Sequence, residues 1–274
     1  MPRSSKPPPA QLGLFGAAAT PAPAPPLVET VDDPEAKDLA ARLPDFIRLG
    51  TSSWTFPGWA GLVYAGRPTQ AQLVRAGLAA YARHPLLRTV GIDRSFYAPI
   101  PRPELEAYAR QVPPGFRAVA KMWEEVTTFA WPAHPRYGAR GGTKNEGFLD
   151  AARARDVIAA YTECFKMYTA CILFEITPQQ PGSIVPDDFA RRVDWLLDEL
   201  PPPDGGLRYA FELRNRDLLT PRYLDALRAH GAAHALSLWS AMPDVGEQLA
   251  VPGVLTAPFC VCRLSLPPRT RYAD

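Results

Sequence analysis

The sequence has no long hydrophobic run, no marked excess of charge of either sign and no secretory leader pattern. Because no hydrophobic run approaches about 20 residues, we expect no transmembrane helix. Arg3 and Lys6 are not followed by the hydrophobic core and small-residue cleavage site of a signal peptide, so we expect a cytoplasmic protein. The formal net charge of +2 argues against a membrane surface or a strong general nucleic-acid surface as partner.

Cysteine and histidine, four of each, are scarce and form no familiar motif. No cysteine pair has the C-x-x-C spacing, and His230 and His234 lack an H-E-x-x-H pattern. We therefore predict no bound cofactor. We expect the cysteines to be small buried side chains in a reducing compartment, with Cys260 and Cys262 on one face of a strand.

Residues 1–37 differ in composition from the rest of the chain, with nine prolines among the first 34 residues and much alanine. Such a segment buries too little apolar surface to order itself, so we predict a disordered tail. Within the tail, the run Q-L-G-L-F resembles the short peptide with which bacterial replication and repair proteins dock onto the sliding clamp. A chance match in an Ala/Leu-rich tail is the alternative. The partner-binding residues would be Gln11, Leu12, Leu14 and Phe15.

Residues 38–274 alternate short apolar runs with helical stretches, a pattern typical of a parallel α/β fold. The expected strands are residues 46–51, 87–93, 116–121, 170–176, 207–213, 233–238 and 259–264. The expected helices are residues 69–83, 103–111, 149–166, 187–200 and 220–230. Seven strands predict a TIM-type (β/α) barrel that lacks its last βα unit, and hence a natural protein that is longer, or a fragment or damaged copy. A doubly wound open sheet is the alternative, but no G-x-G-x-x-G pattern follows the first strand.

The stretch Tyr209–Asn215 marks the centre of the predicted site, because it is apolar up to Glu212 and Arg214. Residues two apart in a strand share one face, so this pair would lie together on a buried strand. Buried charge is costly unless it is paired or used, and the carboxyl ends of barrel strands are where chemistry is expected.

Other predicted strands also end in polar residues, which would converge on the same mouth. Carboxylates and lysine suit acid/base work, arginines clamp carboxylates or phosphates, and aromatic rings offer a platform for a sugar or base. The predicted catalytic residues are Glu212, Asp93, Lys121 and Glu175. The predicted ligand-binding residues are Arg214, Arg263, Trp54, Ser95, Tyr97 and Thr51. Structural ion pairs, or a divalent metal on the three carboxylates, are the alternatives.

Five motifs in order resemble the YecE-like family, a domain of unknown function. They begin at Leu49 (LGTSSWTFPGW), Val90 (VGIDRSFY), Phe116 (FRAVAK), Phe211 (FELR) and Arg263 (RL). The resemblance covers roughly residues 46–270 and implies a cytosolic TIM-type barrel with no established reaction.

The chain departs from the family pattern at the predicted site. Gly91 and Asp93 stand where Glu and Asn are usual, and Arg94 replaces a small polar residue. Glu175 lies where the family usually has Gln.

These observations support three hypotheses. The first is an enzyme-like protein that binds a small anionic or sugar-phosphate-like ligand and performs acid/base or hydrolytic chemistry. The second is an accessory protein of DNA repair or replication, tethered to the sliding clamp. The third is a degenerate, inactive copy.

Overall fold

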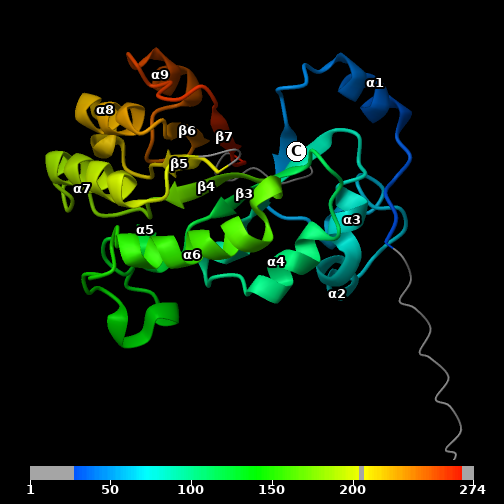
Figure 1. Ribbon diagram of the computed structural model, residues 1–274, viewed down its shortest axis with the longest axis horizontal. Helices are drawn as coiled ribbons and strands as arrows, with labels where there is room; N and C mark the ends of the chain where they lie inside the picture. Colours follow the sequence, from blue (N-terminus) through cyan, green and yellow to red (C-terminus); the bar gives the residue numbers. More distant parts are fainter. Residues whose placement is uncertain (1–27, 204–206, 267–274) are drawn as a thin grey trace, which may run out of the picture.

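The structure, a computed structural model, describes residues 28–203 and 207–266. Its centre is one sheet of seven parallel strands, hydrogen-bonded in chain order from β1 to β7 (Figure 1). The strands are β1 (Leu49–Thr51), β2 (Leu87–Ile92), β3 (Arg117–Lys121), β4 (Thr169–Glu175), β5 (Tyr209–Glu212), β6 (Ala233–Leu238) and β7 (Val261–Leu264). The α-helices are α1 (Pro34–Arg42), α2 (Gln70–Gln72), α3 (Leu78–Tyr81), α4 (Arg102–Ala109), α5 (Glu124–Thr127), α6 (Ala151–Cys164), α7 (Pro186–Glu199), α8 (Pro221–Ala229) and α9 (Val245–Ala250).

The sheet is an open half-barrel, so the expected TIM-type barrel is wrong for this chain. Within the described residues β1 pairs only with β2, and β7 pairs only with β6. A closed barrel needs hydrogen bonds between its first and last strands, and these two strands make none. Short alternating elements specify parallel strand order, but they do not specify whether the sheet closes.

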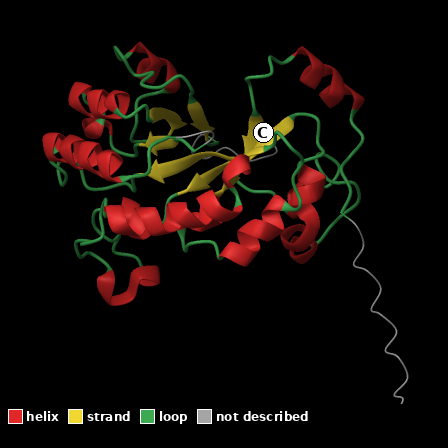
Figure 2. Ribbon diagram, viewed as in Figure 1, coloured by secondary structure: helices red, strands yellow, loops and turns green. Residues whose placement is uncertain are grey.

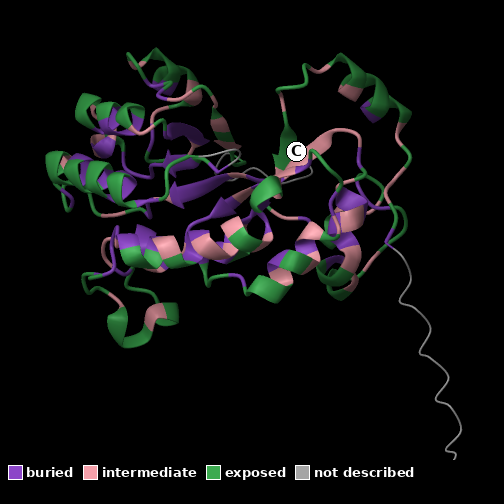
Figure 3. Cartoon of the chain, viewed as in Figure 1, coloured by how far each residue is buried: buried purple, intermediate pink, exposed green. Residues whose placement is uncertain are grey.

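Helices cover the outer face of the sheet, and their inward sides form the main core (Figure 2). Alternate residues of β4 point to opposite faces of the sheet. Ile172 and Phe174 pack into the large core beneath the helices, whereas Cys171 and Leu173 belong to a small cluster on the concave face. The inner strands β3 to β6 are largely buried, the outer strands β1 and β7 are not, and the helices expose their outward sides (Figure 3).

The helix expected at residues 69–83 is interrupted in its middle. Thr69 caps α2 with its side chain, a π-helical turn (η2) spans Leu73–Gly77, and α3 follows directly. A Cβ at Gly77 would lie 3.1 Å from Leu73 and 3.5 Å from Trp54, so the small residue lets the turn approach that indole. The other expected helices lie within two residues of those observed, whereas α1, α5 and α9 were not predicted.

The described part of the chain begins inside the expected tail. Val28 is buried, Thr30 forms an isolated bridge with Tyr64, and α1 begins at Pro34 with Asp33 as its cap. The peptide at residues 11–15 lies outside the described residues, so clamp docking stays a prediction.

No helix in the described ranges is long and apolar enough to cross a bilayer. The longest, α6 and α7, have 14 residues each. At about 1.5 Å per residue, each spans less than the roughly 30 Å of a hydrocarbon core.

Candidate functional site

The predicted charged residues lie together on the concave face of the sheet because of strand periodicity. Side chains at every second position of a strand point to the same face. By this alternation the concave face carries Lys121, Glu175 and Glu212, in line with the small apolar cluster, and each is the last residue of its strand. Parallel strands place their carboxyl ends at one edge. The sheet thus brings side chains that are far apart in sequence to one place.

Asp93 lies at one end of this group of charges. It follows β2 and accepts two hydrogen bonds from the Arg263 guanidinium, at 3.1 and 2.9 Å. The Lys121 ammonium lies 3.2 Å from the same carboxylate and 2.8 Å from Glu175. Because Arg263 is on β7, these contacts reach across the half-barrel even though β2 and β7 are not neighbours.

Glu212 and Arg214 form the most deeply buried part of the group. An Arg214 guanidinium nitrogen lies 2.8 Å from the Glu175 carboxylate and 2.7 Å from that of Glu212. Arg263 lies 3.4 Å from the other carboxylate oxygen of Glu212. The charges are therefore one connected set, named here the ion cluster, formed by Asp93, Lys121, Glu175, Glu212, Arg214 and Arg263.

Glu212 is the group whose proton affinity is most altered. Its side chain is 1% exposed, and desolvation, followed by repulsion from Glu175, raises its pKa to about 7. Neither of its carboxylate oxygens makes a hydrogen bond with good geometry to a described residue, despite the short distance to Arg214. Burial alone would raise the pKa of Glu175. The attraction of its carboxylate to Lys121 and Arg214 is stronger, so the pKa of that carboxyl is lowered. Two neighbouring carboxyls thus differ in protonation near neutral pH.

The ion cluster does not resemble a metal centre. Among the residues that the structure describes, no group of three or more His, Cys, Asp or Glu side chains could hold a metal ion. Each of the three carboxylates faces a lysine or arginine. Lys121 lies within 3.2 Å of both Asp93 and Glu175, so a cationic side chain already neutralises these carboxylates.

The structure places the four other predicted ligand-binding residues in different contacts. Trp54 is buried edge-to-face against Tyr108, and Thr51 bonds the Tyr81 hydroxyl. Ser95 is buried, with its hydroxyl 2.5 Å from the carbonyl of Ile92 and 2.7 Å from that of Lys121, so it ties the ends of β2 and β3 together.

Tyr97 is 57% exposed, and the Arg136 guanidinium stacks 4.2 Å from its ring. It is therefore available at the surface, but none of its described contacts is with the ion cluster.

One residue of the site, Trp239, was not predicted from the sequence. The Arg214 guanidinium lies 4.2 Å from the ring of Trp239, which follows β6. Trp239 has the same strand parity as Ala233 and Ala235 of the concave face, so periodicity alone could have indicated it. A Cβ at Gly91 would lie 3.0 Å from Asp93 and 3.3 Å from Arg263, so this glycine also faces the ion cluster.

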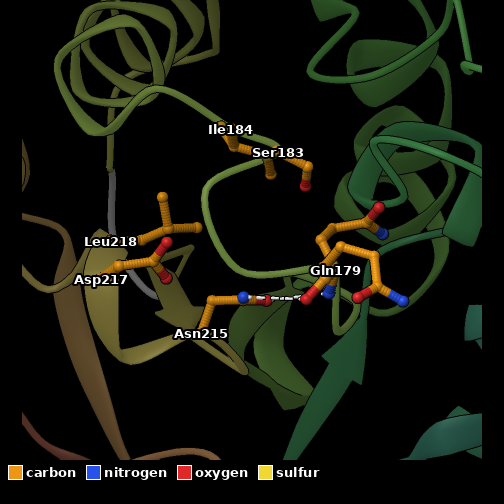
Figure 4. Close-up of a pocket in the computed structure, with 7 residues that line it drawn as sticks. Gln179, Ser183, Ile184, Asn215, Asp217 and Leu218 are labelled. Carbon is orange, nitrogen blue, oxygen red and sulfur yellow. Dashed lines mark hydrogen bonds between the residues drawn. The ribbon is translucent and has the colours of Figure 1, made fainter.

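A narrow recess, too small to admit a water molecule, lies between the segments that follow β4 and β5 (Figure 4). Asn215 closes one side of it. Its side-chain oxygen accepts from the Gln179 backbone N–H at 2.8 Å, and its amide donates to the Gln179 carbonyl at 3.0 Å. These bonds fix the loop after Glu175 to the segment after Arg214.

A parallel half-barrel with buried charge at its strand ends defines an α/β protein with a candidate site on the concave face. The chain belongs to the family described as protein of unknown function DUF72, whose model matches residues 48–274. This is the YecE-like family that the motifs resemble. No curated protein matches the chain.

Two solved structures of DUF72 family proteins are similar to the chain. The one from Thermotoga maritima is 17% identical, with a TM-score of 0.57 over 80% of this chain and 74% of that chain. The one from Enterococcus faecalis is 19% identical, with a TM-score of 0.45 over 68% of each chain. The first likeness concerns the fold alone, so function has to be argued from the ion cluster.

Proposed function

We propose that the ion cluster binds a small anionic ligand of the sugar-phosphate type and that Glu212 transfers a proton to or from it. One observation carries the proposal: a fully buried glutamate with a pKa of about 7 lies between two arginines, and its oxygens lack well-formed hydrogen bonds within the described chain. A group with a pKa near the working pH is populated both as acid and as base, which suits general acid/base catalysis.

The balance of charge favours anion binding when Glu212 is protonated. Lys121, Arg214 and Arg263 contribute three positive charges, and ionised Asp93 and Glu175 contribute two negative ones. The ion cluster is then neutral with Glu212 ionised and carries +1 with Glu212 protonated. An anion therefore binds together with a proton on Glu212, and its affinity falls as pH rises above about 7.

Arg214 supplies the binding groups for such an anion. Its side chain is 7% exposed, and its Nε and Nη1 atoms are buried without a hydrogen-bond partner among the described residues. Leaving buried donors unpaired costs free energy, which a ligand oxygen would recover. The face of Trp239 against the guanidinium fixes its plane.

The competing explanation is that the six charges only hold the strand ends together. Burying ion pairs gives little net stability compared with apolar packing, which argues against a purely structural purpose. Sulfate distinguishes the two explanations, because it is an anion that does not titrate near neutral pH.

We expect sulfate, titrated into the full chain, to change the fluorescence of Trp239, and a Trp239→Phe variant to lose that change. Arg214→Lys should weaken sulfate binding at least tenfold, because a lysine cannot offer the planar donor set. Arg102→Ala is the matched control. Arg102 makes a two-point pair with Glu163 in which both side chains are more than half exposed, so its loss should leave sulfate affinity unchanged.

The pH dependence provides the second test. Wild-type affinity for sulfate should fall about tenfold per pH unit above pH 7, whereas Glu212→Gln should bind sulfate with little dependence on pH. Equal affinity of wild type and Arg214→Lys, or a flat wild-type profile, would show that the ion cluster is structural.

A second candidate function rests on the peptide at residues 11–15. Its Gln-Leu-x-Leu-Phe pattern favours docking to a bacterial sliding clamp. A pull-down with the clamp should recover wild type and a Pro23→Ala control, but not a Leu14→Ala/Phe15→Ala variant. Equal recovery of all three contradicts clamp docking.

A further inference from the structure

The cysteines beside β7 differ from the expectation of buried thiols. Cys171 is buried and Cys164 is half-buried, but Cys260 and Cys262 are exposed, and their sulfur atoms lie 3.9 Å apart. We propose that Cys260 and Cys262 form a thiol–disulfide exchange site that reacts with low-molecular-weight disulfides such as glutathione disulfide.

The backbone geometry permits a bond between these sulfurs. Residues two apart in a strand have Cα atoms about 6.6–6.8 Å apart, at the upper end of the range that disulfides span. Cys260 lies one residue before Val261, the first residue of β7 paired with β6. Its backbone is therefore outside the ladder and can shift to bring the sulfurs to about 2 Å. A disulfide at the limit of this range is strained and easily reduced, so the pair would cycle rather than remain oxidised.

The two thiols are also unequal, as exchange requires. The hydrogen bond between the sulfurs lowers the pKa of Cys262 to about 7 and raises the pKa of Cys260. A thiol with a pKa near ambient pH is the most effective attacking group in disulfide exchange. We therefore assign the first attack, on glutathione disulfide, to Cys262. Cys260 then displaces the glutathione bound to Cys262.

The chemistry balances without any further reactant. The Cys262 thiolate attacks one sulfur of glutathione disulfide, forms a mixed disulfide and releases one glutathione thiolate. The Cys260 thiol then loses its proton and attacks the Cys262 sulfur, which releases the second glutathione. The protein loses two protons and two electrons, and glutathione disulfide gains them as two glutathione molecules.

The test is to incubate the reduced full chain with glutathione disulfide under native conditions, and then to measure its intact mass and map its peptides. The intact mass of the wild type should fall by two hydrogen atoms, with no glutathione retained and no disulfide between chains. Peptide mapping should show a Cys260–Cys262 disulfide that dithiothreitol reduces. Cys260→Ser should instead retain one glutathione on Cys262, because no second thiol displaces it. Cys164→Ser is the matched control and should behave as wild type.

Three results would overturn the proposal. Wild type could stay unmodified, keep glutathione as Cys260→Ser does, or form disulfides between chains. Circular dichroism of each variant checks that the fold is retained, which is expected for the β7 pair because both side chains are exposed.

Discussion

Glu212 shows how strongly one residue depends on its surroundings. The carboxyl is an ordinary glutamate in the sequence, but burial and the nearby Glu175 raise its pKa from 4.5 to about 7. Two residues further along the chain stands Arg214, whose charge only partly offsets that burial.

The first prediction concerns stability against pH. A raised folded-state pKa means that the folded chain binds the proton more tightly than the unfolded chain, so stability falls as pH rises from about 4.5 to about 7. Glu212→Gln has no such proton. Between pH 5 and pH 8 the wild type should therefore lose on the order of 1–3 kcal/mol relative to the variant, as measured by urea unfolding.

Other titrating groups do not confuse this comparison. Burial lowers the pKa of His234 to about 4, which gives the opposite slope, but it does so in both proteins and cancels in the difference. The lowered pKa of Glu175 affects stability only at more acidic pH. Parallel pH curves for wild type and variant would contradict the prediction.

The second prediction concerns Gly91 and Asp93, which stand where the resembling family usually has Glu and Asn. Both positions lie close to the Arg263 guanidinium, so a carboxylate at either one could pair with this arginine. Gly91→Glu alone should destabilise by about 1–3 kcal/mol through crowding, and Asp93→Asn alone should do so through loss of the ion pair. The double variant should recover at least half of the summed loss in urea unfolding. Additive losses would show that the two positions are independent.

At the scale of elements, side chains from neighbouring loops fix the rim of the sheet. Asn215 pairs with both backbone groups of Gln179 and is buried. Asp217, in the same recess, is only half-buried and accepts the Gly182 N–H at 3.2 Å. Asn215 thus makes two of the hydrogen bonds that hold the loop after β4.

The third prediction follows from this pairing. Asn215→Ala should destabilise by about 1–3 kcal/mol, because it leaves a backbone N–H and a carbonyl of the recess unpaired. It should also raise the hydrogen-exchange rate of the Gln179 amide at least tenfold. Asp217→Ala is the matched control and should cost less than about 1 kcal/mol. Equal effects of the two substitutions would show that the loop is held by other contacts.

Within residues 28–203 and 207–266, the open half-barrel has two edge strands, β1 and β7. Leu49 on β1 is 42% exposed and Leu264 on β7 is 69% exposed. Edge strands with exposed apolar side chains template pairing with other chains. We therefore expect the chain to self-associate through these edges.

The fourth prediction tests that tendency. Leu264→Lys should lower light scattering of concentrated protein at least twofold, because an edge lysine opposes strand pairing. Leu39→Lys, on α1 and 40% exposed, is the control and should leave scattering unchanged. If both variants reduce scattering equally, general solubility rather than the edge is responsible.

Local pattern determined the strands, most helices and which residues share a face, because periodicity is a property of neighbouring residues. It therefore indicated Glu212, Arg214, Lys121, Glu175, Asp93 and Arg263 as one site. Only the tertiary structure decided that the sheet stays open, that Trp54 packs in the core and that Trp239 covers Arg214. Sheet closure, burial and the pKa of Glu212 depend on groups that are far apart in the chain. The sequence pattern does not give the distances between such groups in the folded protein.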